Sequence, residues 1–315
     1  MIHRTLMASV ATIAVIALAS PALAQDISFT SEQSYPESFT FSAEQDVFML
    51  GSVRQGLVAK VDRNGAYTPF IVDDRLISTV GLLVDDARNT LWVTNSDPGA
   101  GERTAAASQG TLAAIATYDA TNGQPRAYFD LGGLSEGAHF ANDVALDAAG
   151  NAYVTDSFAP LIYKIDTDGK ATIFAQDPTF FTEQGFNLNG IAWHEDGYLL
   201  VGKYNSGELF RISTTDPTDI HAVQLPEALI GVDGIHLADA DHLIAVQNLG
   251  IDRIVELTST DSWHSATIVR SEPSVISMPT AAATVGEDIY VLNSRLDTLF
   301  DPNAAKVGDY LLQQF

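Results

Sequence analysis

The stretch NDVALDAAGNAYVTDS, residues 142–157, contains the pattern that decides the fold. It reads as a short apolar strand, a turn rich in Asp, Gly and Asn, and a second strand that ends in small polar residues. The same pattern recurs five more times, at residues 37–52, 80–96, 189–204, 233–248 and 280–294. One apolar residue of the second strand serves as a marker in each copy: Phe48, Trp92, Tyr153, Leu200, Ile244 and Tyr290. Such a repeat predicts an array of similar structural units.

The spacing of the markers defines the unit. Successive markers are 44, 61, 47, 44 and 46 residues apart, and the one long interval contains a polar insertion at residues 97–109. Each unit continues into a third and a fourth strand, as in LIYKIDTDGKATIFA (161–175). Six units of four antiparallel strands predict an all-β, six-bladed β-propeller that forms a single domain over residues 25–315.

The last unit is one strand short. After Tyr290 only YLLQQF (310–315) reads as a strand, whereas DISFTSE (26–32) precedes the first unit and belongs to none. An unpaired edge strand exposes backbone groups that favour aggregation. We therefore expect the N-terminal strand to pair with the outer edge of the last sheet and to close the ring.

Residues 1–24 read as a signal peptide that is removed on export. Arg4 is followed by an apolar run from Leu6 to Ala19, and Ala22-Leu23-Ala24 forms a cleavage signal. The run is too short and too rich in alanine for a stable membrane span. The sequence therefore predicts a bacterial protein that is periplasmic or secreted and has no membrane anchor.

Composition limits the partners of the chain. Its 315 residues include 16 basic and 40 acidic side chains, a net charge of −24, and no cysteine. The charge disfavours nucleic acid, which needs clustered lysine and arginine. The lack of cysteine excludes disulfides and thiolate metal sites. We expect a small-molecule substrate and a monomer.

Four side-chain oxygens share one register of the repeat. The innermost strands of a propeller run in the same direction, so equivalent positions form a ring around the axis. Counting back from each marker to the start of the first strand gives Glu37, Val80, Asn142, Asn189, Asp233 and Pro279 or Thr280. Two carboxylates and two carboxamides without sulfur are suited to a hard cation, with Ca²⁺ ahead of Mg²⁺ or another divalent ion.

The motifs PESFTF (36–41), ANDVALDAAGNAYVTDS (141–157), NGIAW (189–193) and VDGI (232–235) resemble the gluconolactonase/senescence-marker-protein family. That family is a branch of the calcium-dependent phosphotriesterase superfamily, alongside diisopropylfluorophosphatase and the paraoxonases. The resemblance covers nearly all of the chain after residue 24. It implies a six-bladed propeller that hydrolyses lactones or phosphotriesters at a divalent cation in the central tunnel.

The resemblance also implies roles for single residues. The family's metal ligands match Glu37, Asn142, Asn189 and Asp233, and the last also inherits the role of catalytic base or nucleophile. Two positions depart from the family. His236 replaces the aspartate with which some members hold a second calcium ion, and Phe140 replaces the arginine of the sugar-lactone members. The second change favours a more apolar substrate.

Further residues are predicted to surround the substrate. The ends of the second strands lie on the same face as the starts of the first strands, and His139 and Phe140 precede a predicted ligand. The predicted pocket residues are His139, Phe140, Asn95, Asp156, Tyr204, Asn248 and Asn293. Two roles stay open for His139, a proton shuttle or a buried histidine with satisfied hydrogen bonds, and the second is favoured. The insertion at 97–109 leaves the end of a second strand, where it forms either a lid or a mobile decoration.

These observations predict a metal-dependent hydrolase of a lactone or related ester, with Ca²⁺ as the cofactor. In this chemistry the ion polarises the substrate oxygen and Asp233 activates water or attacks directly. Two alternatives stay open. One is a phosphotriesterase-type hydrolase, and the other is a non-catalytic propeller that binds a ligand or protein and holds a structural ion.

Overall fold

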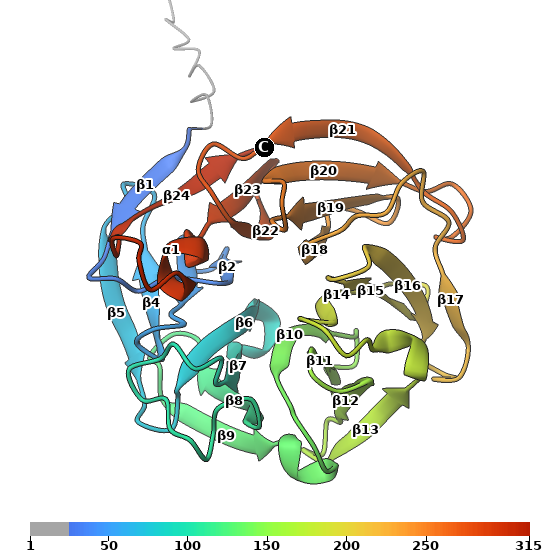
Figure 1. Cartoon of the computed structure of the whole chain (residues 1–315), viewed down its shortest axis with the longest axis horizontal. Helices are drawn as coiled ribbons and strands as arrows, with labels where there is room; N and C mark the ends of the chain where they lie inside the picture. Colours follow the sequence, from blue (N-terminus) through green and yellow to red (C-terminus); the bar gives the residue numbers. More distant parts are fainter. Residues whose placement is uncertain (1–24) are drawn as a thin grey trace, which may run out of the picture.

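The computed structural model describes residues 25–315, and the predicted signal peptide at 1–24 lies outside this range. The described chain forms six four-stranded antiparallel sheets around one axis, as Figure 1 shows. The prediction of an all-β, six-bladed propeller is therefore confirmed. No helix within residues 25–315 has the length and apolar character that crossing a membrane requires.

The first three blades follow one another around the axis, each with its strands in chain order from the inside outwards. Blade 1 contains β2 (Phe39–Ser42), β3 (Val47–Gly51), β4 (Leu57–Val61) and β5 (Tyr67–Val72). Blade 2 contains β6 (Ser78–Asp85), β7 (Thr90–Ser96), β8 (Ala113–Asp119) and β9 (Pro125–Asp130). Blade 3 contains β10 (Ala141–Leu146), β11 (Ala152–Asp156), β12 (Leu161–Ile165) and β13 (Ala171–Gln176).

The next blades repeat this order. Blade 4 contains β14 (Leu188–His194), β15 (Tyr198–Lys203), β16 (Glu208–Ser213) and β17 (Ile220–Ala222). Blade 5 contains β18 (Val232–Leu237), β19 (His242–Gln247), β20 (Arg253–Thr258) and β21 (Thr267–Pro273). Blade 6 contains β22 (Pro279–Val285), β23 (Asp288–Asn293), β24 (Asp309–Gln314) and β1 (Ile27–Thr30). The short helix α1 (Leu296–Phe300) lies in the connection between β23 and β24.

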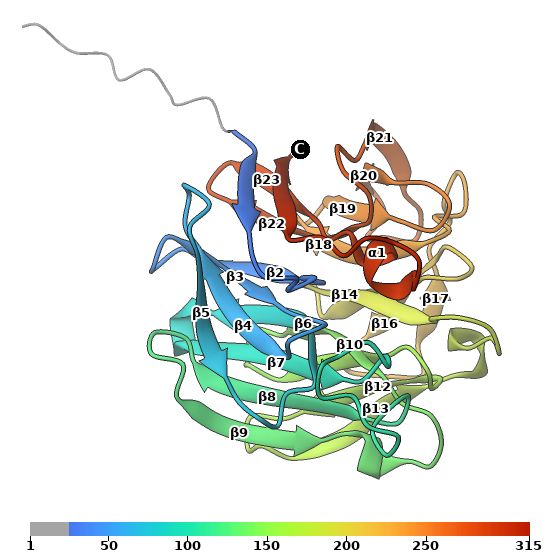
Figure 2. The same ribbon diagram turned by 60° about the vertical axis from the view of Figure 1, so that its left-hand side comes forward.

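The N-terminal strand closes the ring, as the sequence predicted. In Figure 2, β1 runs beside β24, with Ile27 opposite Leu312 and Thr30 opposite Asp309. Phe29 on β1 is 2% exposed and stacks on Tyr310 at 5.5 Å between ring centroids. Pairing and aromatic packing thus cover the edge that β24 alone would expose.

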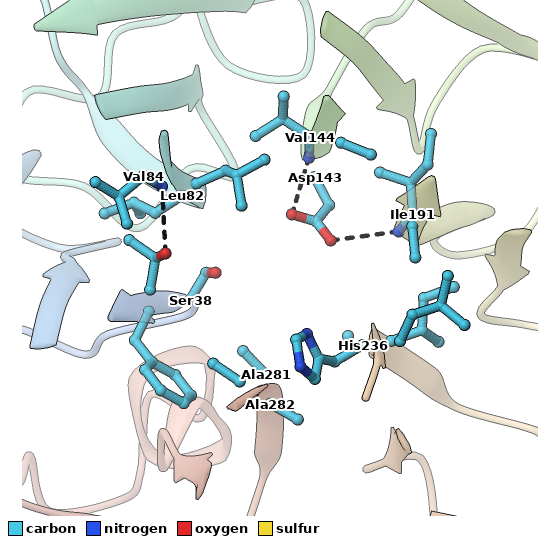
Figure 3. A pocket seen from close by; sticks show the side chains of 18 of the residues that line it. Ser38, Leu82, Val84, Asp143, Val144, Ile191, His236, Ala281 and Ala282 are labelled. Atoms are coloured by element: carbon cyan, nitrogen blue, oxygen red, sulfur yellow. Dashed lines mark hydrogen bonds between the residues drawn. The ribbon is translucent and has the colours of Figure 1, made fainter. Parts of the chain in front are cut away.

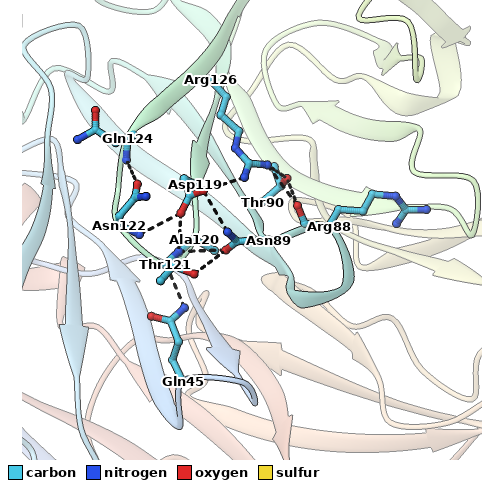
Figure 4. Close-up of polar contacts among 10 residues, drawn as sticks. All are labelled: Gln45, Arg88, Asn89, Thr90, Asp119, Ala120, Thr121, Asn122, Gln124 and Arg126. Atoms are coloured by element: carbon cyan, nitrogen blue, oxygen red, sulfur yellow. Dashed lines mark hydrogen bonds and ion pairs between the residues drawn. The ribbon is translucent and has the colours of Figure 1, made fainter.

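Turns at the far ends of the inner strands join neighbouring blades through polar contacts. Figure 4 shows this network between blades 1 and 2. Within blade 2, the Asn89 side chain donates to Asp119 at 3.0 Å, and Arg126 donates to the same carboxylate at 2.9 Å. Gln45 of blade 1 donates to the Ala120 carbonyl of blade 2 at 3.0 Å. These contacts fix one end of the blades, while the opposite end carries the loops around the candidate site.

Candidate metal and substrate site

The inner strands begin with a repeated irregularity that exposes one side chain to the axis. The pairing register shifts by one residue between Ala141 and Val144 in β10, and at the equivalent places in β14 and β18. A bulge of this kind turns a side chain away from regular strand alternation. Asn142, Asn189 and Asp233 lie at these bulges, and Glu37 lies two residues before the start of β2. The structure brings all four side chains into one cavity of about 170 Å³.

Glycine allows the neighbouring inner strands to approach closely at the bulges. A Cβ atom on Gly190 would lie 2.5 Å from the Asp233 carbonyl oxygen, and one on Gly234 would lie 2.4 Å from that of Thr280. Both distances are below ordinary contact, so a larger residue would push the strands apart. The Asn189-Gly190 and Asp233-Gly234 pairs lie within β14 and β18, where the glycines serve close strand packing at the axis.

Hydroxyl groups of the second strands hold the backbone of this ring. Thr94 donates to the Asn142 carbonyl at 2.6 Å, and Thr155 donates to the Asn189 carbonyl at 2.6 Å. Each bond runs from one blade to the inner strand of the next. The recurring V-T-(N/D)-S ends of the second strands thus position the predicted ligands without contacting the axis themselves.

Asn142 presents an oxygen with no protein partner. Its amide nitrogen donates to the Ser157 hydroxyl at 2.9 Å, which orients the side chain. Its Oδ1 atom is buried and has no hydrogen-bond partner among the described residues. A buried amide oxygen without a partner is unfavourable in a folded protein. A bound cation would supply a partner for this buried amide oxygen.

The two carboxylates of the ring repel one another. Burial raises the pKa of Glu37 well above its usual range, and the charges of Asp233 and Asp143 raise it further. Burial raises the pKa of Asp233 to about 7, opposed by hydrogen bonds from Asn248 and Asn189. A divalent cation between the carboxylates would offset both the cost of burying their charges and their mutual repulsion. Among the described residues no cluster of three or more His, Cys, Asp or Glu side chains is suited to a metal, so a ligand set here depends on the two amides.

Two of the predicted pocket residues line this cavity, and a third, Asn248, bonds to the lining residue Asp233. The two lining residues are Phe140 and Tyr204. The Tyr204 hydroxyl donates to Asn248 Oδ1 at 2.8 Å, and the Asn248 amide donates in turn to Asp233 Oδ2 and, at 3.0 Å, to the Pro279 carbonyl. Asn248 therefore fixes the orientation of the Asp233 carboxylate.

The other four predicted pocket residues, His139, Asn95, Asp156 and Asn293, do not line the cavity. Asn95 accepts from the Ile77 backbone and Asn293 from the Ile276 backbone, each at 2.8 Å. Asp156 accepts from the Phe140 backbone at 2.9 Å. These side chains hold the loop that leads into their own blade. The strand ends lie on the expected face, but strand alternation turns these side chains away from the axis.

His139 is buried against Asp156, outside the lining of this cavity. It is 2% exposed, and its Nδ1 atom lies 2.8 Å from Asp156 Oδ2. The hydrogen bond and charge of Asp156 raise the pKa of His139, against the effect of burial. The Tyr163 hydroxyl donates to the same carboxylate oxygen at 2.8 Å.

Loops supply an apolar wall that the repeat register does not reveal. The lining side chains of this wall are Val53, Val80, Pro98, Phe140, Phe186, Met278, Leu296 and Phe300. Phe140, Phe158 and Phe186 form a cluster with centroid distances of 5.1 to 5.2 Å. No lysine or arginine of the described chain lines the cavity. Sequence analysis missed Phe186, Met278 and the α1 residues, because these loops share no common spacing.

The insertion at 97–109 forms part of the wall and is tied to the body of the protein. Pro98 lines the cavity. Arg103 donates to the Gln55 carbonyl at 2.6 Å and the Leu76 carbonyl at 3.0 Å, and Glu102 pairs with Arg54 at 3.3 Å. These contacts anchor the insertion over blades 1 and 2.

A second cavity of about 350 Å³ opens along the same inner strands, beyond the bulges. Figure 3 shows Asp143 there, accepting from the backbone of Val144 at 2.9 Å and of Ile191 at 3.3 Å. Burial raises the pKa of Asp143 to about 7 and lowers that of His236 to about 4. His236 Nε2 lies 2.7 Å from the Thr284 hydroxyl. The hydroxyls of Ser38 and Thr40 also line this cavity, among apolar side chains of all six inner strands.

The propeller fold is shared with proteins of low sequence identity. The Mala s 1 allergen of Malassezia sympodialis superposes with a TM-score of 0.71 at 18% identity, over 93% of this chain and 96% of that one. A luciferin-regenerating enzyme superposes with a TM-score of 0.63 at 13% identity, over 92% of this chain and 95% of that one. A candidate gluconolactonase superposes with a TM-score of 0.61 at 12% identity, over 93% of each chain. No protein-family model and no curated protein matches the sequence. These likenesses establish the fold alone.

Proposed function

We propose that this protein is a divalent-metal-dependent hydrolase of a lactone or related ester, with Ca²⁺ as the cofactor. The observation that carries the proposal is the buried Asn142 Oδ1 atom, which has no protein partner in the described chain and faces a site that also holds Glu37, Asn189 and Asp233. Four hard oxygen donors with two negative charges match the preferences of Ca²⁺.

Glu37, Asn142, Asn189 and Asp233 would hold the ion. Bound there, it would supply Lewis-acid polarisation of the substrate oxygen and stabilisation of the developing negative charge. The two carboxylates balance its charge, and the amides contribute oxygens without further repulsion. Ser157 orients Asn142, and Asn248 orients Asp233.

Asp233 is the residue we assign to chemistry beyond metal binding. It lines the cavity and accepts a hydrogen bond from Asn248, which leaves part of the carboxylate for water or substrate. A carboxylate in this position either removes a proton from water or attacks the acyl carbon. Tyr204 supports it through Asn248.

The cavity favours a compact, uncharged and apolar substrate. Its volume of about 170 Å³ is close to that of the ~150 Å³ apolar cavity that accommodates benzene. Phe140, Phe186 and Met278 offer no hydrogen bonds to sugar hydroxyls, and two carboxylates disfavour an anion. A monocyclic lactone with a short hydrocarbon substituent meets these conditions, and so does a small aryl ester.

Membership of the gluconolactonase/senescence-marker-protein group is part of the proposal. The order of the four motifs and the candidate gluconolactonase among the structural neighbours support it. Export to the periplasm, directed by residues 1–24, and a monomeric state also remain proposals.

The test is a substrate screen of purified protein against aliphatic lactones, aryl esters and phosphotriesters, with Ca²⁺ and with EDTA. We expect lactone or ester turnover that EDTA abolishes and Ca²⁺ restores, and that Asp233→Asn lacks. Turnover of phosphotriesters alone would assign the phosphotriesterase alternative. If no substrate reacts while Ca²⁺ raises the melting temperature, the protein is a binding propeller with a structural ion.

A further inference from the structure

Outside the four-oxygen ring, a serine, a histidine and an aspartate form a chain of side-chain contacts. Ser135 stands in the loop between β9 and β10, directly after a single 3-10 turn at Gly132–Leu134. Its hydroxyl lies 3.3 Å from His139 Nε2, and His139 Nδ1 lies 2.8 Å from Asp156 Oδ2. These are the separations of a nucleophile, its base and the group that orients the base.

The proton positions follow from the neighbours of the imidazole. Asp156 accepts at Nδ1, so a neutral His139 carries its proton there and presents a lone pair at Nε2. The Ser135 hydroxyl, at 3.3 Å, is the group that can donate to that lone pair. When His139 is protonated, its Nε2–H group donates instead to the Ser135 carbonyl at 3.1 Å, a bond that helps to raise the pKa of His139. Asp156 is itself fixed by the backbone of Phe140 and Phe158, each at 2.9 Å.

The serine is accessible and has hydrogen-bond donors beside it. Ser135 is half-buried, and the following residues Glu136 and Gly137 are exposed. The backbone N–H groups of these two residues have no hydrogen-bond acceptor within the described part of the chain. The segment Gly133–Gly137 also has the spacing G-x-S-x-G, in which the N–H after the serine stabilises an oxyanion. In the described chain, Ser135 follows a short 3-10 turn and precedes β10, so the strand-to-helix elbow of that motif is not formed.

The geometry points to a second, metal-independent acyl-transfer centre, in which Ser135 is the nucleophile, His139 the base and Asp156 the positioning residue. The Ser135 oxygen bonds to an ester carbonyl carbon as its proton passes to His139 Nε2. The carbon–oxygen bond to the leaving alcohol then breaks, and the alcohol takes that proton. Water releases the acyl group by the reverse transfers and restores the serine.

The surroundings define the substrate class. Leu134 is 39% exposed beside the serine, whereas Glu136 and Asp130 make the loop acidic. An uncharged ester with a short acyl chain fits this surface, and an anionic ester does not.

The experiment exposes the full mature chain to a fluorophosphonate probe in EDTA, which removes any metal-dependent turnover of the probe. We expect a single covalent adduct, located in the tryptic peptide of residues 127–164. Ser135→Ala should abolish the adduct, and His139→Gln should slow its formation roughly 10²–10⁴-fold. Ser206→Ala is the matched control, because its hydroxyl bonds the Glu208 carboxylate rather than a histidine. It should leave labelling unchanged.

The same variants are tested for EDTA-resistant hydrolysis of 4-nitrophenyl acetate, with melting curves as the control for folding. Loss of both labelling and hydrolysis in folded Ser135→Ala supports the proposal. An adduct elsewhere, no adduct, or labelling that is indifferent to His139→Gln overturns it and leaves the three residues as a loop anchor. Neither result depends on the metal site.

Discussion

The two cavities along the axis are built from the same inner strands and differ in chemistry. At the strand starts, Asn142 and its equivalents form a polar ring beneath an apolar wall. Beyond the bulges, the cavity is lined by apolar side chains together with the hydroxyls of Ser38, Thr40 and Thr284, and Asp143 and His236 are its titratable groups. Asn142 and Asp143 are adjacent, yet they face opposite cavities. The position of the bulge in each inner strand thus decides which of the two cavities a side chain lines.

Asp233→Asn should have the largest effect on the ring. The substitution keeps the shape and one ligand oxygen but removes the charge and the base, so kcat/KM should fall at least 10²–10⁴-fold. The measurement is steady-state kinetics on the best substrate, with circular dichroism as the control for folding. If Asp233→Asn keeps the turnover of the wild type, the four-oxygen ring is not catalytic.

Asn142→Ala and Ser157→Ala separate a ligand from the residue that orients it. Loss of the Ser157 hydroxyl should weaken Ca²⁺ binding roughly 10–100-fold, and loss of the Asn142 oxygen should weaken it more. Excess Ca²⁺ should restore part of the activity in both. Isothermal titration calorimetry gives the affinities, and equal affinity in wild type and Asn142→Ala would remove Asn142 from the ligand set.

Ca²⁺ should stabilise the folded chain. An ion at a hundred times its Kd adds about 2.7 kcal/mol to the free energy of unfolding. At roughly 2–4 °C per kcal/mol for large domains, Tm should rise by several degrees over the EDTA sample. Asp233→Asn should reduce this rise. Identical melting curves with Ca²⁺ and EDTA would argue against a bound ion.

Without metal, stability should depend on pH. Burial raises the folded-state pKa of Asp233 from 3.8 to about 7 and that of Glu37 in the same direction. The folded chain therefore binds more protons than the unfolded chain between these values, and Tm in EDTA should fall as pH rises from about 4 to about 7. Ca²⁺ should remove much of this fall. The matched variant Glu37→Gln should show a shallower pH dependence in EDTA than wild type.

His236→Gln should have the smallest effect, since it changes only the opposite cavity. The pKa of His236 is lowered to about 4, so its imidazole is neutral under assay conditions. This imidazole contacts Thr284 and not the four-oxygen ring. We expect unchanged kcat/KM and unchanged Ca²⁺ affinity. A large loss of either would mean that the two cavities act as one site.

Sequence reasoning predicted the blades and the ring positions because both follow a local period. The marker spacing fixed the number of units, and the Asn and Asp residues stand at one register of the repeat. Sequence reasoning also placed Asn95, Asp156 and Asn293 at the pocket, because they share that regularity, whereas the structure shows them bonded to loops of their own blade. It did not find Phe186 or Phe300, because loop lengths vary between blades.

The amino-acid sequence by itself determined the six-fold repeat, the closing strand and the four oxygens at one register, since each depends on alternation and spacing along the chain. Only the tertiary structure decided which side chains meet. The unpartnered Asn142 oxygen, the aromatic wall from separate loops and the contact of Ser135 with His139 and Asp156 all depend on how the loops and blades pack. Side-chain direction at a strand end is set by a one-residue bulge and by hydrogen bonds to neighbouring loops, and neither has a signature in local sequence.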